Sequence, residues 1–260
     1  MTKIVAIDTE FERKHTYRPI LSIVQIREEN KDPVIYDVYK KENEKLIDLL
    51  EILANDDIVK IIHSARQDVE AIFYRFHIEM HNIFDTQIAY KYIYNENEIG
   101  YAKIVQNICK TEIIKEKTLQ KSNWLHRPLK KEQIFYAKQD VLYLHEIYSK
   151  MIEIFKKNEQ LYIQFKNECS ILEDEKNYSF NPQHIWQKMK HKFINDINRN
   201  MIKDMIICRE KLAYKANIPR EFVLKTSNLL NFAHTGNIAF LKTHHKIDKK
   251  VFINLYKKYK

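Results

Sequence analysis

Short strand patterns, interrupted by one helical pattern, fill the first 62 residues of the chain. Four segments rich in β-branched residues and bounded by polar or turn residues predict strands over residues 3–8, 20–26, 34–38 and 58–62. Between the third and fourth segments, the apolar spacing of residues 45–53 predicts a helix. This order indicates an α/β domain that opens with a meander of strands.

A helix-start signal follows the fourth predicted strand. Ser64 precedes an apolar-periodic stretch and Gln67 stands three residues later, which is the spacing of a reciprocal capping box. We therefore expect a helix to begin at Ser64, with Asp68 in its first turn directly after a strand.

The patterns become helical from about residue 85 onward. Residues 131–157 form one long amphipathic pattern, which predicts a single helix. Lys130 stands at its N-cap position, where Ser or Thr is usual. After residue 195 every predicted element is helical, and Pro219 starts a new segment.

Composition sets limits on the class of protein. With 260 residues, 45% of them hydrophobic, the chain can form one sizeable domain and a smaller one. No stretch approaches the ~20 uninterrupted apolar residues that span a bilayer, so we expect a soluble, cytoplasmic protein. The widely spaced Cys109, Cys169 and Cys208 are expected to be reduced thiols. Gly100 and Gly236 are the only glycines, which excludes the dinucleotide fingerprint and the P-loop.

Positive charge is concentrated in the last third of the chain. Residues 183–260 hold 17 Lys and Arg against 5 Asp and Glu, whereas residues 1–182 hold 27 against 30. A basic excess of this kind is typical of proteins that bind a polyanion, most often nucleic acid. A solvated basic surface without a ligand is the alternative.

Two acidic residues lie side by side at the end of the first predicted strand. Asp8 and Glu10 are two positions apart, so the period of a strand places both side chains on one face. Neighbouring carboxylates repel each other unless a cation lies between them. An ordinary polar strand terminus remains the alternative for this pair considered alone.

Three further residues are ambiguous when considered singly. Tyr136 and Asp140 are four apart and share one helix face, which is also the spacing of core aromatics beside a surface charge. Asp68 is favoured in a first helical turn by the helix dipole, whatever its function.

Together these residues stand in three ordered motifs that cover about 150 residues and resemble ribonuclease D, within the 3′-5′ exonucleases named for four acidic residues and a tyrosine. The motifs are AIDTEFERKHTYRP with LSIVQI, holding Asp8 and Glu10; KIIHSARQDVEAIF with FDTQIAY, holding Asp68; and KSNWLHRPLKKEQIFYAKQDVLYL, holding Tyr136 and Asp140. The residues Trp124 to Leu129 precede the last pair in the manner typical of the family.

This resemblance implies a ribonuclease H-like α/β fold, with a mixed sheet flanked by helices and two divalent ions, Mg²⁺ or Mn²⁺. It implies that Asp8, Glu10 and Asp140 hold the first ion. Asp8 would also reach the second ion, on which Asp68 would act through water. Hard oxygen ligands of this kind suit both metals.

The same resemblance implies hydrolysis of the terminal phosphodiester, with release of a nucleoside 5′-monophosphate. Tyr136 would orient the attacking water. Thr9, Phe11 and His63 would face the terminal nucleotide; strand packing for Phe11 and a capped core position for His63 are the alternatives. Asp85 is expected to cap the helix beginning TQIAY. Lys117 and Arg127 are interpreted either as phosphate contacts or as members of structural ion pairs.

The C-terminal part resembles the helical domain shared by RecQ-type helicases and ribonuclease D, the HRDC domain. Arg209, Glu210, Ala213 and the IPREFVL segment match its pattern, while Cys208 replaces the usual aromatic. Ribonuclease D usually carries two copies, and one fits here. We therefore expect an exonuclease domain over residues 1–165, a helical connector over 166–194 and an HRDC-like all-α domain over 195–260.

The resulting hypothesis is a 3′-5′ exoribonuclease that trims transfer RNA precursors and other small structured RNAs. RNA would be its partner, with no membrane association, and the basic helical domain would contact the RNA backbone. Two alternatives stay open. One is an exonuclease of the same chemistry that acts on DNA, and the other is a catalytically silent nucleic-acid-binding protein.

Overall fold

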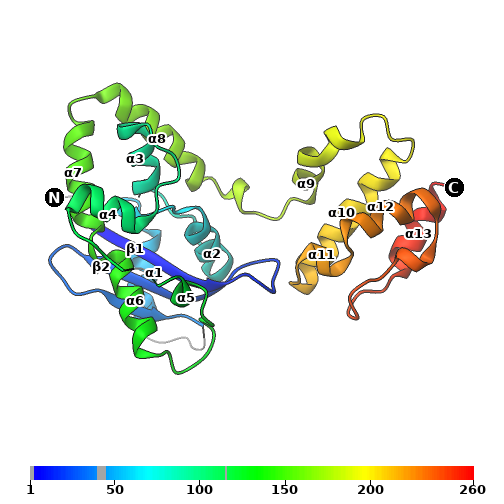
Figure 1. The fold of residues 1–260 in the computed structure, drawn as a ribbon, viewed down its shortest axis with the longest axis horizontal. Coiled ribbons are helices and arrows are strands. Elements are labelled where there is room, and N and C mark those ends of the chain that lie inside the picture. Colours follow the sequence, from blue (N-terminus) through cyan, green and yellow to red (C-terminus); the bar gives the residue numbers. More distant parts are fainter. Residues whose placement is uncertain (1–2, 40–44, 115) are drawn as a thin grey trace. The chain divides into compact units, whose positions relative to one another are not determined.

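The computed structural model describes residues 3–39, 45–114 and 116–260. These residues form five strands: β1 (Ile4–Glu12), β2 (Ile20–Glu28), β3 (Val34–Asp37), β4 (Val59–Ile62) and β5 (Ile83–Asp85). They also form thirteen α-helices: α1 (Lys45–Ala54), α2 (Arg66–Phe76), α3 (Thr86–Tyr94), α4 (Tyr101–Cys109), α5 (Lys117–Gln120), α6 (Lys131–Leu142), α7 (Leu144–Phe155), α8 (Glu159–Glu173), α9 (Pro182–Met189), α10 (Arg199–Ala216), α11 (Arg220–Val223), α12 (Thr226–Thr235) and α13 (Lys250–Lys258) (Figure 1). The chain divides into two compact units, the first comprising Met1–Glu12 and Pro19–Tyr178 and the second comprising Arg13–Arg18 and Ser179–Lys260.

The first unit is built on one mixed sheet with strand order β3-β2-β1-β4-β5. The pairs β1/β2 and β2/β3 are antiparallel, whereas β1/β4 and β4/β5 are parallel. The predicted fold class, an α/β domain with a mixed sheet followed by an all-α region, is confirmed, and so are the four predicted strands and the helix α1.

The central strand β1 is longer than the sequence pattern predicted. Its antiparallel pairing with β2 extends from Val5 opposite Glu28 to Glu12 opposite Ile20, with an irregularity between Glu10 and Phe11. The prediction that the strand ends near Asp8 is therefore wrong. The apolar run stops there, but a partner strand continues to supply backbone hydrogen bonds.

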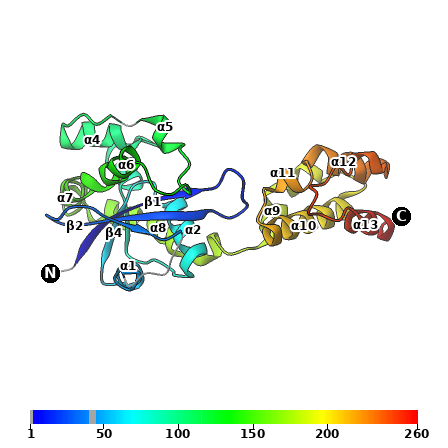
Figure 2. The same ribbon diagram turned by 90° about the horizontal axis from the view of Figure 1, so that it is seen from below.

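Two hydrophobic cores lie on opposite faces of the sheet. One contains Val5 and Ile7 with residues of α1 and α2, and the other contains Ala6 with residues of α3, α4, α7 and α8. Figure 2 shows α1 below the sheet and α4 and α6 above it. Because successive strand residues face opposite sides, Asp8 and Glu10 lie on the face of Ala6, beneath α6.

The predicted continuous helix over residues 131–157 is wrong, because α6 ends at Leu142 and α7 begins at Leu144. The Tyr101 hydroxyl accepts a hydrogen bond from Tyr143 N (3.2 Å) and donates one to Gln139 O (3.1 Å). In an unbroken helix Tyr143 N–H would bond Gln139 C=O directly. The hydroxyl thus replaces one helical hydrogen bond, while the apolar pattern continues across the break.

The predicted capping box at Ser64 is also wrong. Helix α2 begins at Arg66 with Ala65 as N-cap, and Ser64 adopts φ +59°. The carboxylate of Asp85 accepts hydrogen bonds from Ser64 N (3.1 Å) and Ala65 N (2.7 Å). The distant Asp85 carboxylate therefore accepts from the Ser64 N–H, which is the role that the sequence pattern assigned to the Gln67 side chain. Asp68 does lie in the first turn as predicted.

The second unit is helical and has its own core, built from residues of α9, α10, α12 and α13. Arg209 and Glu210 are fully buried in this core, and Arg209 Nη2 lies 3.4 Å from Glu210 Oε1. Arg209 Nη1 donates to Thr226 Oγ1 (2.8 Å) and to Leu224 O (3.2 Å). Tyr17, from the short N-terminal segment of this unit, donates to Glu210 Oε2 (3.0 Å). The Arg-Glu pair of the predicted HRDC-like pattern is thus an internal hydrogen-bonding centre.

Among the helices that the structure describes, none is both long enough and apolar enough to cross a membrane.

Helix α6 begins as predicted, with Lys130 as N-cap and its backbone N–H bonded to Gln133 Oε1 (3.0 Å). This forms one half of a capping box. The lysine side chain ends in an ammonium group, which donates hydrogen bonds and cannot accept one from the helix backbone.

Replacing Lys130 by threonine should complete the box and raise the free energy of unfolding by about 0.5–1 kcal/mol. Urea denaturation at neutral pH measures the difference. Lys130→Ala, which adds no acceptor, is the control and should give no gain. Equal stability of the two variants would contradict this description of the helix start.

Lys60 on β4 is a fully buried lysine. Its Nζ donates to three backbone carbonyls: Asn55 O (2.6 Å), His81 O (3.0 Å) and Ile58 O (3.2 Å). Burial lowers the pKa of this ammonium from 10.5 to about 8, against the opposing attraction of Asp56 and Glu173.

This pKa shift predicts a pH-dependent stability. Between pH 8 and 10.5 the unfolded chain binds more protons at Lys60 than the folded protein does. The contribution of Lys60 to the free energy of unfolding therefore increases as the pH rises through this range. Denaturation curves at pH 7.5 and 10 should therefore show wild type gaining stability relative to Lys60→Met. The exposed Lys138→Met is the control and should change in parallel with wild type; parallel behaviour of Lys60→Met would refute the assignment.

Candidate metal centre

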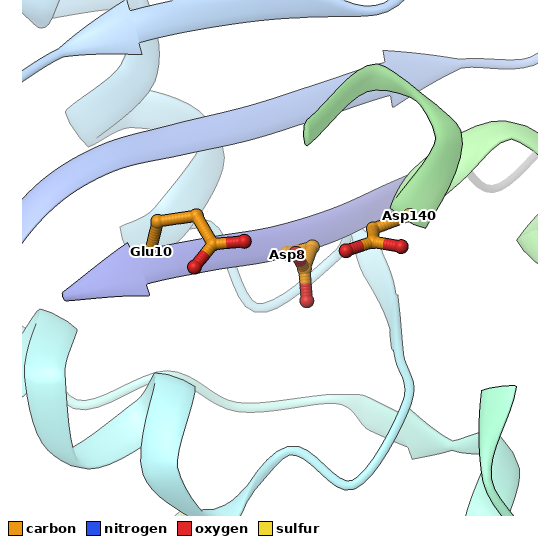
Figure 3. A group of neighbouring side chains, drawn as sticks. All are labelled: Asp8, Glu10 and Asp140. Carbon is orange, nitrogen blue, oxygen red and sulfur yellow. The ribbon is translucent and has the colours of Figure 1, made fainter. Parts of the chain in front are cut away.

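Three acidic side chains converge where α6 crosses the central strand. Asp8 and Glu10 project from β1 and Asp140 from α6, and one carboxylate oxygen of each lies within 4.8 Å of the others. Figure 3 shows the three carboxylates in a row along the strand, with Asp140 reaching it from the helix. The structure thus brings together three of the four acids that the sequence predicted.

Packing of α6 on the sheet fixes this arrangement. Tyr136 and Ala137 form a small buried cluster with Ile23 of β2 and with Trp124. Asp140 follows Tyr136 by one helical turn, so the same packing directs it towards β1. The family-like tryptophan segment therefore has a structural role in positioning the acid.

The cluster is electrostatically unfavourable without a cation. Glu10 and Asp140 are only 8% and 6% exposed, and two like charges about 5 Å apart at an effective dielectric constant near 20 repel by about 3 kcal/mol. A divalent ion would convert this repulsion into attraction, and hard carboxylate oxygens are the ligands that Mg²⁺ and Mn²⁺ prefer. The donor set fits such an ion.

Asp68 lies outside this group of three but lines the same pocket. It is buried in the first turn of α2, and the Thr9 hydroxyl donates to its Oδ1 over 2.5 Å. Burial is the largest cause that raises the pKa of Asp68, to about 7, and the nearby Asp85 adds to it while the Thr9 hydrogen bond opposes it. A cation in the pocket would favour its ionised form.

Tyr136 is a protonated phenol beside the carboxylates. Burial raises its pKa well above the ordinary value of 10, and Asp140, Glu10 and Asp8 raise it further through their charges, with a hydrogen bond to Asp140 as a smaller cause. The hydroxyl therefore keeps its proton at neutral pH and can donate it in a hydrogen bond.

A pocket of about 720 Å³ surrounds these groups. This volume lies within the range of about 300–1,000 Å³ that is usual for ligand sites. Its lining residues are Asp8, Thr9, Glu10, Phe11, His63, Ser64, Gln67, Asp68, Gly100, Tyr101, Ala102, Lys103, Gln120, Tyr136 and Asp140. All eight residues that the sequence predicted for the site therefore line one pocket.

His63 is held in place from two sides. Its Nδ1 lies 2.9 Å from Thr86 Oγ1, and the centroid of its ring lies 5.6 Å from the centroid of the Tyr101 ring. Both contacts orient the imidazole at the pocket wall.

Sequence reasoning missed Gln25 and Tyr101. Gln25 is fully buried directly opposite Asp8, and its Nε2 donates to Asp8 Oδ2 (3.3 Å). A glutamine inside the apolar run LSIVQI was a usable signal, because a buried amide requires a polar neighbour. Tyr101 had no such signal, since its hydrogen-bond partners Gln139 and Tyr143 lie about 40 residues away, near the C-terminal end of α6.

Asp85 and Arg127 are not among the described residues that line the pocket. Asp85 caps α3 as predicted, accepting from Gln87 N (2.8 Å) and Ile88 N (3.2 Å). Arg127 forms the structural ion pair, with its Nη2 at 2.7 Å from Asp37 Oδ1. Lys117 begins α5, and its side chain lies outside the described residues.

Comparisons with known proteins agree with this geometry. A family model described as 3′-5′ exonuclease matches residues 1–156. A ribonuclease D of Nitrobacter hamburgensis is 30% identical over 223 residues, which cover 85% of this chain and 57% of that protein. The chain thus spans little more than half the length of this relative. The similarity to ribonuclease D that the motifs predicted is confirmed.

Solved structures also resemble the chain, and two of them are informative. The crystal structure of Escherichia coli RNase D, an exoribonuclease involved in structured RNA processing, matches with a TM-score of 0.85 at 22% identity, covering 98% of this chain and 69% of that one. Brucella melitensis NrnC with bound Mg²⁺ matches with a TM-score of 0.53 at 26% identity, covering 63% and 80%. The first supports the fold of the whole described chain.

Neutralising Asp140 should raise the stability of the metal-free protein and weaken metal binding. Without metal, Asp140→Asn should melt at a higher temperature than wild type, because one of three repelling charges is removed. Saturating Mg²⁺ or Mn²⁺ should raise the melting temperature of wild type by several degrees, corresponding to about 2–3 kcal/mol at a hundredfold excess over Kd. The variant should respond much less.

The exposed Asp32→Asn is the control for loss of one negative charge and should behave as wild type does. A metal-induced shift in Asp140→Asn equal to that of wild type would exclude Asp140 as a ligand.

Proposed function

The chain belongs to the 3′-5′ exonuclease family, and we propose that it acts on RNA, removing nucleoside 5′-monophosphates one at a time from the 3′ end. The observation that carries this proposal is the group of three carboxylates within 4.8 Å, beside a protonated tyrosine in one pocket. The similarity to proteins named ribonuclease D favours RNA as the substrate.

Asp8, Glu10 and Asp140 would hold one divalent ion, and Asp8 and Asp68 would serve a second; Mg²⁺ and Mn²⁺ both suit these ligands. When bound, two such ions stabilise the attacking and leaving oxygens of an in-line displacement at phosphorus. Gln25 holds the shared ligand Asp8 through its 3.3 Å hydrogen bond, and Thr9 holds Asp68. These contacts reduce the reorganisation needed when substrate enters.

Tyr136 would orient the water that attacks the terminal phosphodiester. Its hydroxyl lies among the carboxylates and keeps its proton, so it can position the oxygen of a water molecule without itself becoming a base. The released proton would pass to water or to a carboxylate, and the displaced oxygen would become the new 3′-hydroxyl of the shortened chain.

Thr9, Phe11 and His63 would contact the terminal nucleotide. All three line the pocket, and Phe11 and His63 offer aromatic rings on which a base or sugar can pack. The packing of His63 between Thr86 and Tyr101 fixes the orientation in which it would meet the substrate.

The C-terminal unit would act as an HRDC-like RNA contact. Residues 183–260 carry the basic excess of the chain, with 17 Lys and Arg against 5 Asp and Glu. Such a surface lends affinity without reading sequence, and its contribution falls steeply with salt. We place the protein in the cytoplasm, where maturation of transfer RNA precursors and other small structured RNAs is the role that this combination suits.

Incubation of 3′-labelled RNA with Mg²⁺ or Mn²⁺ tests the catalytic proposal. Wild type should release labelled mononucleotides, and Asp140→Ala should release none. Tyr136→Phe should lower kcat by about 10²-fold, because the water loses one of its positioning partners. The metal-induced rise in melting temperature should persist in Tyr136→Phe, since no ligand is lost.

Tyr143→Phe is the matched control, because Tyr143 lies outside the set of residues that line the pocket. Precursor transfer RNA, unstructured RNA and a matched DNA oligomer are compared in the same assay. Faster degradation of DNA would redirect the proposal to a DNA exonuclease, and equal release by wild type and Asp140→Ala, or none by either, would overturn it.

A further inference from the structure

The N-cap and first turn of α4 contribute four consecutive residues, Gly100 to Lys103, to the pocket that holds the carboxylates. From this placement we infer that Lys103 binds a phosphate of the substrate backbone upstream of the cleaved linkage. The inference rests on the proposed function, because it assigns a contact within the same substrate site.

Helix α4 is fixed firmly enough to place such a contact. Tyr101 is buried, with its ring against His63 and its hydroxyl bonded to Gln139 O (3.1 Å) and Tyr143 N (3.2 Å). Ile104 and Val105 are fully buried in the core shared with α7. Lys103 lies between these buried positions, so its backbone is held while its side chain remains exposed.

Charge makes Lys103 distinctive in the pocket. Among the described residues that line it, four are carboxylic acids and Lys103 is the one lysine or arginine. Its Nζ donates to Gln106 Oε1 (3.1 Å), which is a neutral amide on the next turn. The ammonium charge is therefore not cancelled by that partner.

A polynucleotide substrate needs a cation at this position. Metal held by the acids would balance the cleaved phosphate, but each upstream phosphate brings a further negative charge towards a pocket rich in carboxylates. A lysine paired with one of those phosphates offsets this repulsion and fixes the register of the chain without reading its sequence. Lys103 would thus be a substrate-binding residue and not a metal ligand.

Lys103→Gln tests the contact, because glutamine removes the charge and keeps a polar side chain. Binding of a fluorescent single-stranded RNA is measured by anisotropy over a series of KCl concentrations, with both proteins also carrying Asp140→Asn so that the RNA is not consumed. Loss of Lys103 should weaken binding about tenfold at low salt and reduce the slope of log Kd against log salt by about one.

Lys110→Gln is the matched control, because Lys110 is the exposed C-cap residue at the other end of α4. It should leave both the affinity and the slope unchanged, and an unchanged melting temperature shows that each variant is folded. Equal affinity and slope for Lys103→Gln and Lys110→Gln would overturn the inference.

Neutral linkages identify the phosphate. RNA oligomers are made with one methylphosphonate at each of the four linkages upstream of the terminal one. At one of these positions the neutral linkage should weaken binding by the protein that retains Lys103 about as much as Lys103→Gln weakens binding of unmodified RNA. The same neutral linkage should not weaken binding by Lys103→Gln any further. If the effects of the neutral linkage and of Lys103→Gln on affinity were independent at every position, so that the two fold-changes multiplied, a direct phosphate contact would be excluded.

Because these readouts measure binding, they remain decisive whatever the outcome of the nuclease assay. A chain that binds RNA through Lys103 but releases no mononucleotide would uphold the inference and refute the proposed function. If the wild-type protein degrades RNA but Lys103→Gln binds RNA as tightly as the protein with Lys103, the proposed function would stand and the inference would be refuted.

Discussion

The mutual repulsion of Asp8, Glu10 and Asp140 is the constraint on which the rest of the first unit depends. Three carboxylates within 4.8 Å of one another persist only where rigid elements hold them. Strand β1 supplies that rigidity because it lies in the middle of the sheet, with a packed core on each face. Helix α6 is held rigidly by the packing of Trp124 and Tyr136 against Ile23 of β2. The stability of these hydrophobic contacts offsets the electrostatic cost of a metal-ready site.

Local patterns in the sequence predicted most of the fold, and the resemblance of three motifs to ribonuclease D predicted the acidic site. Alternating apolar residues revealed the strands, and same-face spacing paired Asp8 with Glu10 and Tyr136 with Asp140. What the patterns missed depends on contacts between distant segments. The hydroxyl that interrupts the helix after Leu142 comes from Tyr101, and the acceptor at the start of α2 comes from Asp85. Neither contact leaves a periodic trace around the residue that it affects.

Polar groups divide between two tasks in the two units. In the first unit the buried carboxylates face a pocket, and the groups around them, such as Gln25 and Thr9, orient them. In the second unit the buried pair Arg209 and Glu210 forms internal contacts, and the Arg209 hydrogen bonds to Leu224 O and Thr226 Oγ1 tie α10 to the start of α12. The charges that remain for a partner are the numerous lysines of residues 183–260. Charged groups thus converge on a pocket in the first unit, whereas in the second unit the charge that remains is a general basic excess.

The hydroxyl of Tyr101 has a thermodynamic consequence. It bonds Gln139 O, the backbone position next to Asp140, and it belongs to the same helical turn as Lys103. A ligand that shifted α4 would therefore move the backbone beside Asp140. A ligand that fixed the position of Asp140 would in turn restrict α4. Linkage requires this effect to be reciprocal, so that each ligand changes the affinity for the other by the same factor. The Tyr101 hydroxyl would thus couple a ligand that contacts α4 to a ligand that contacts Asp140.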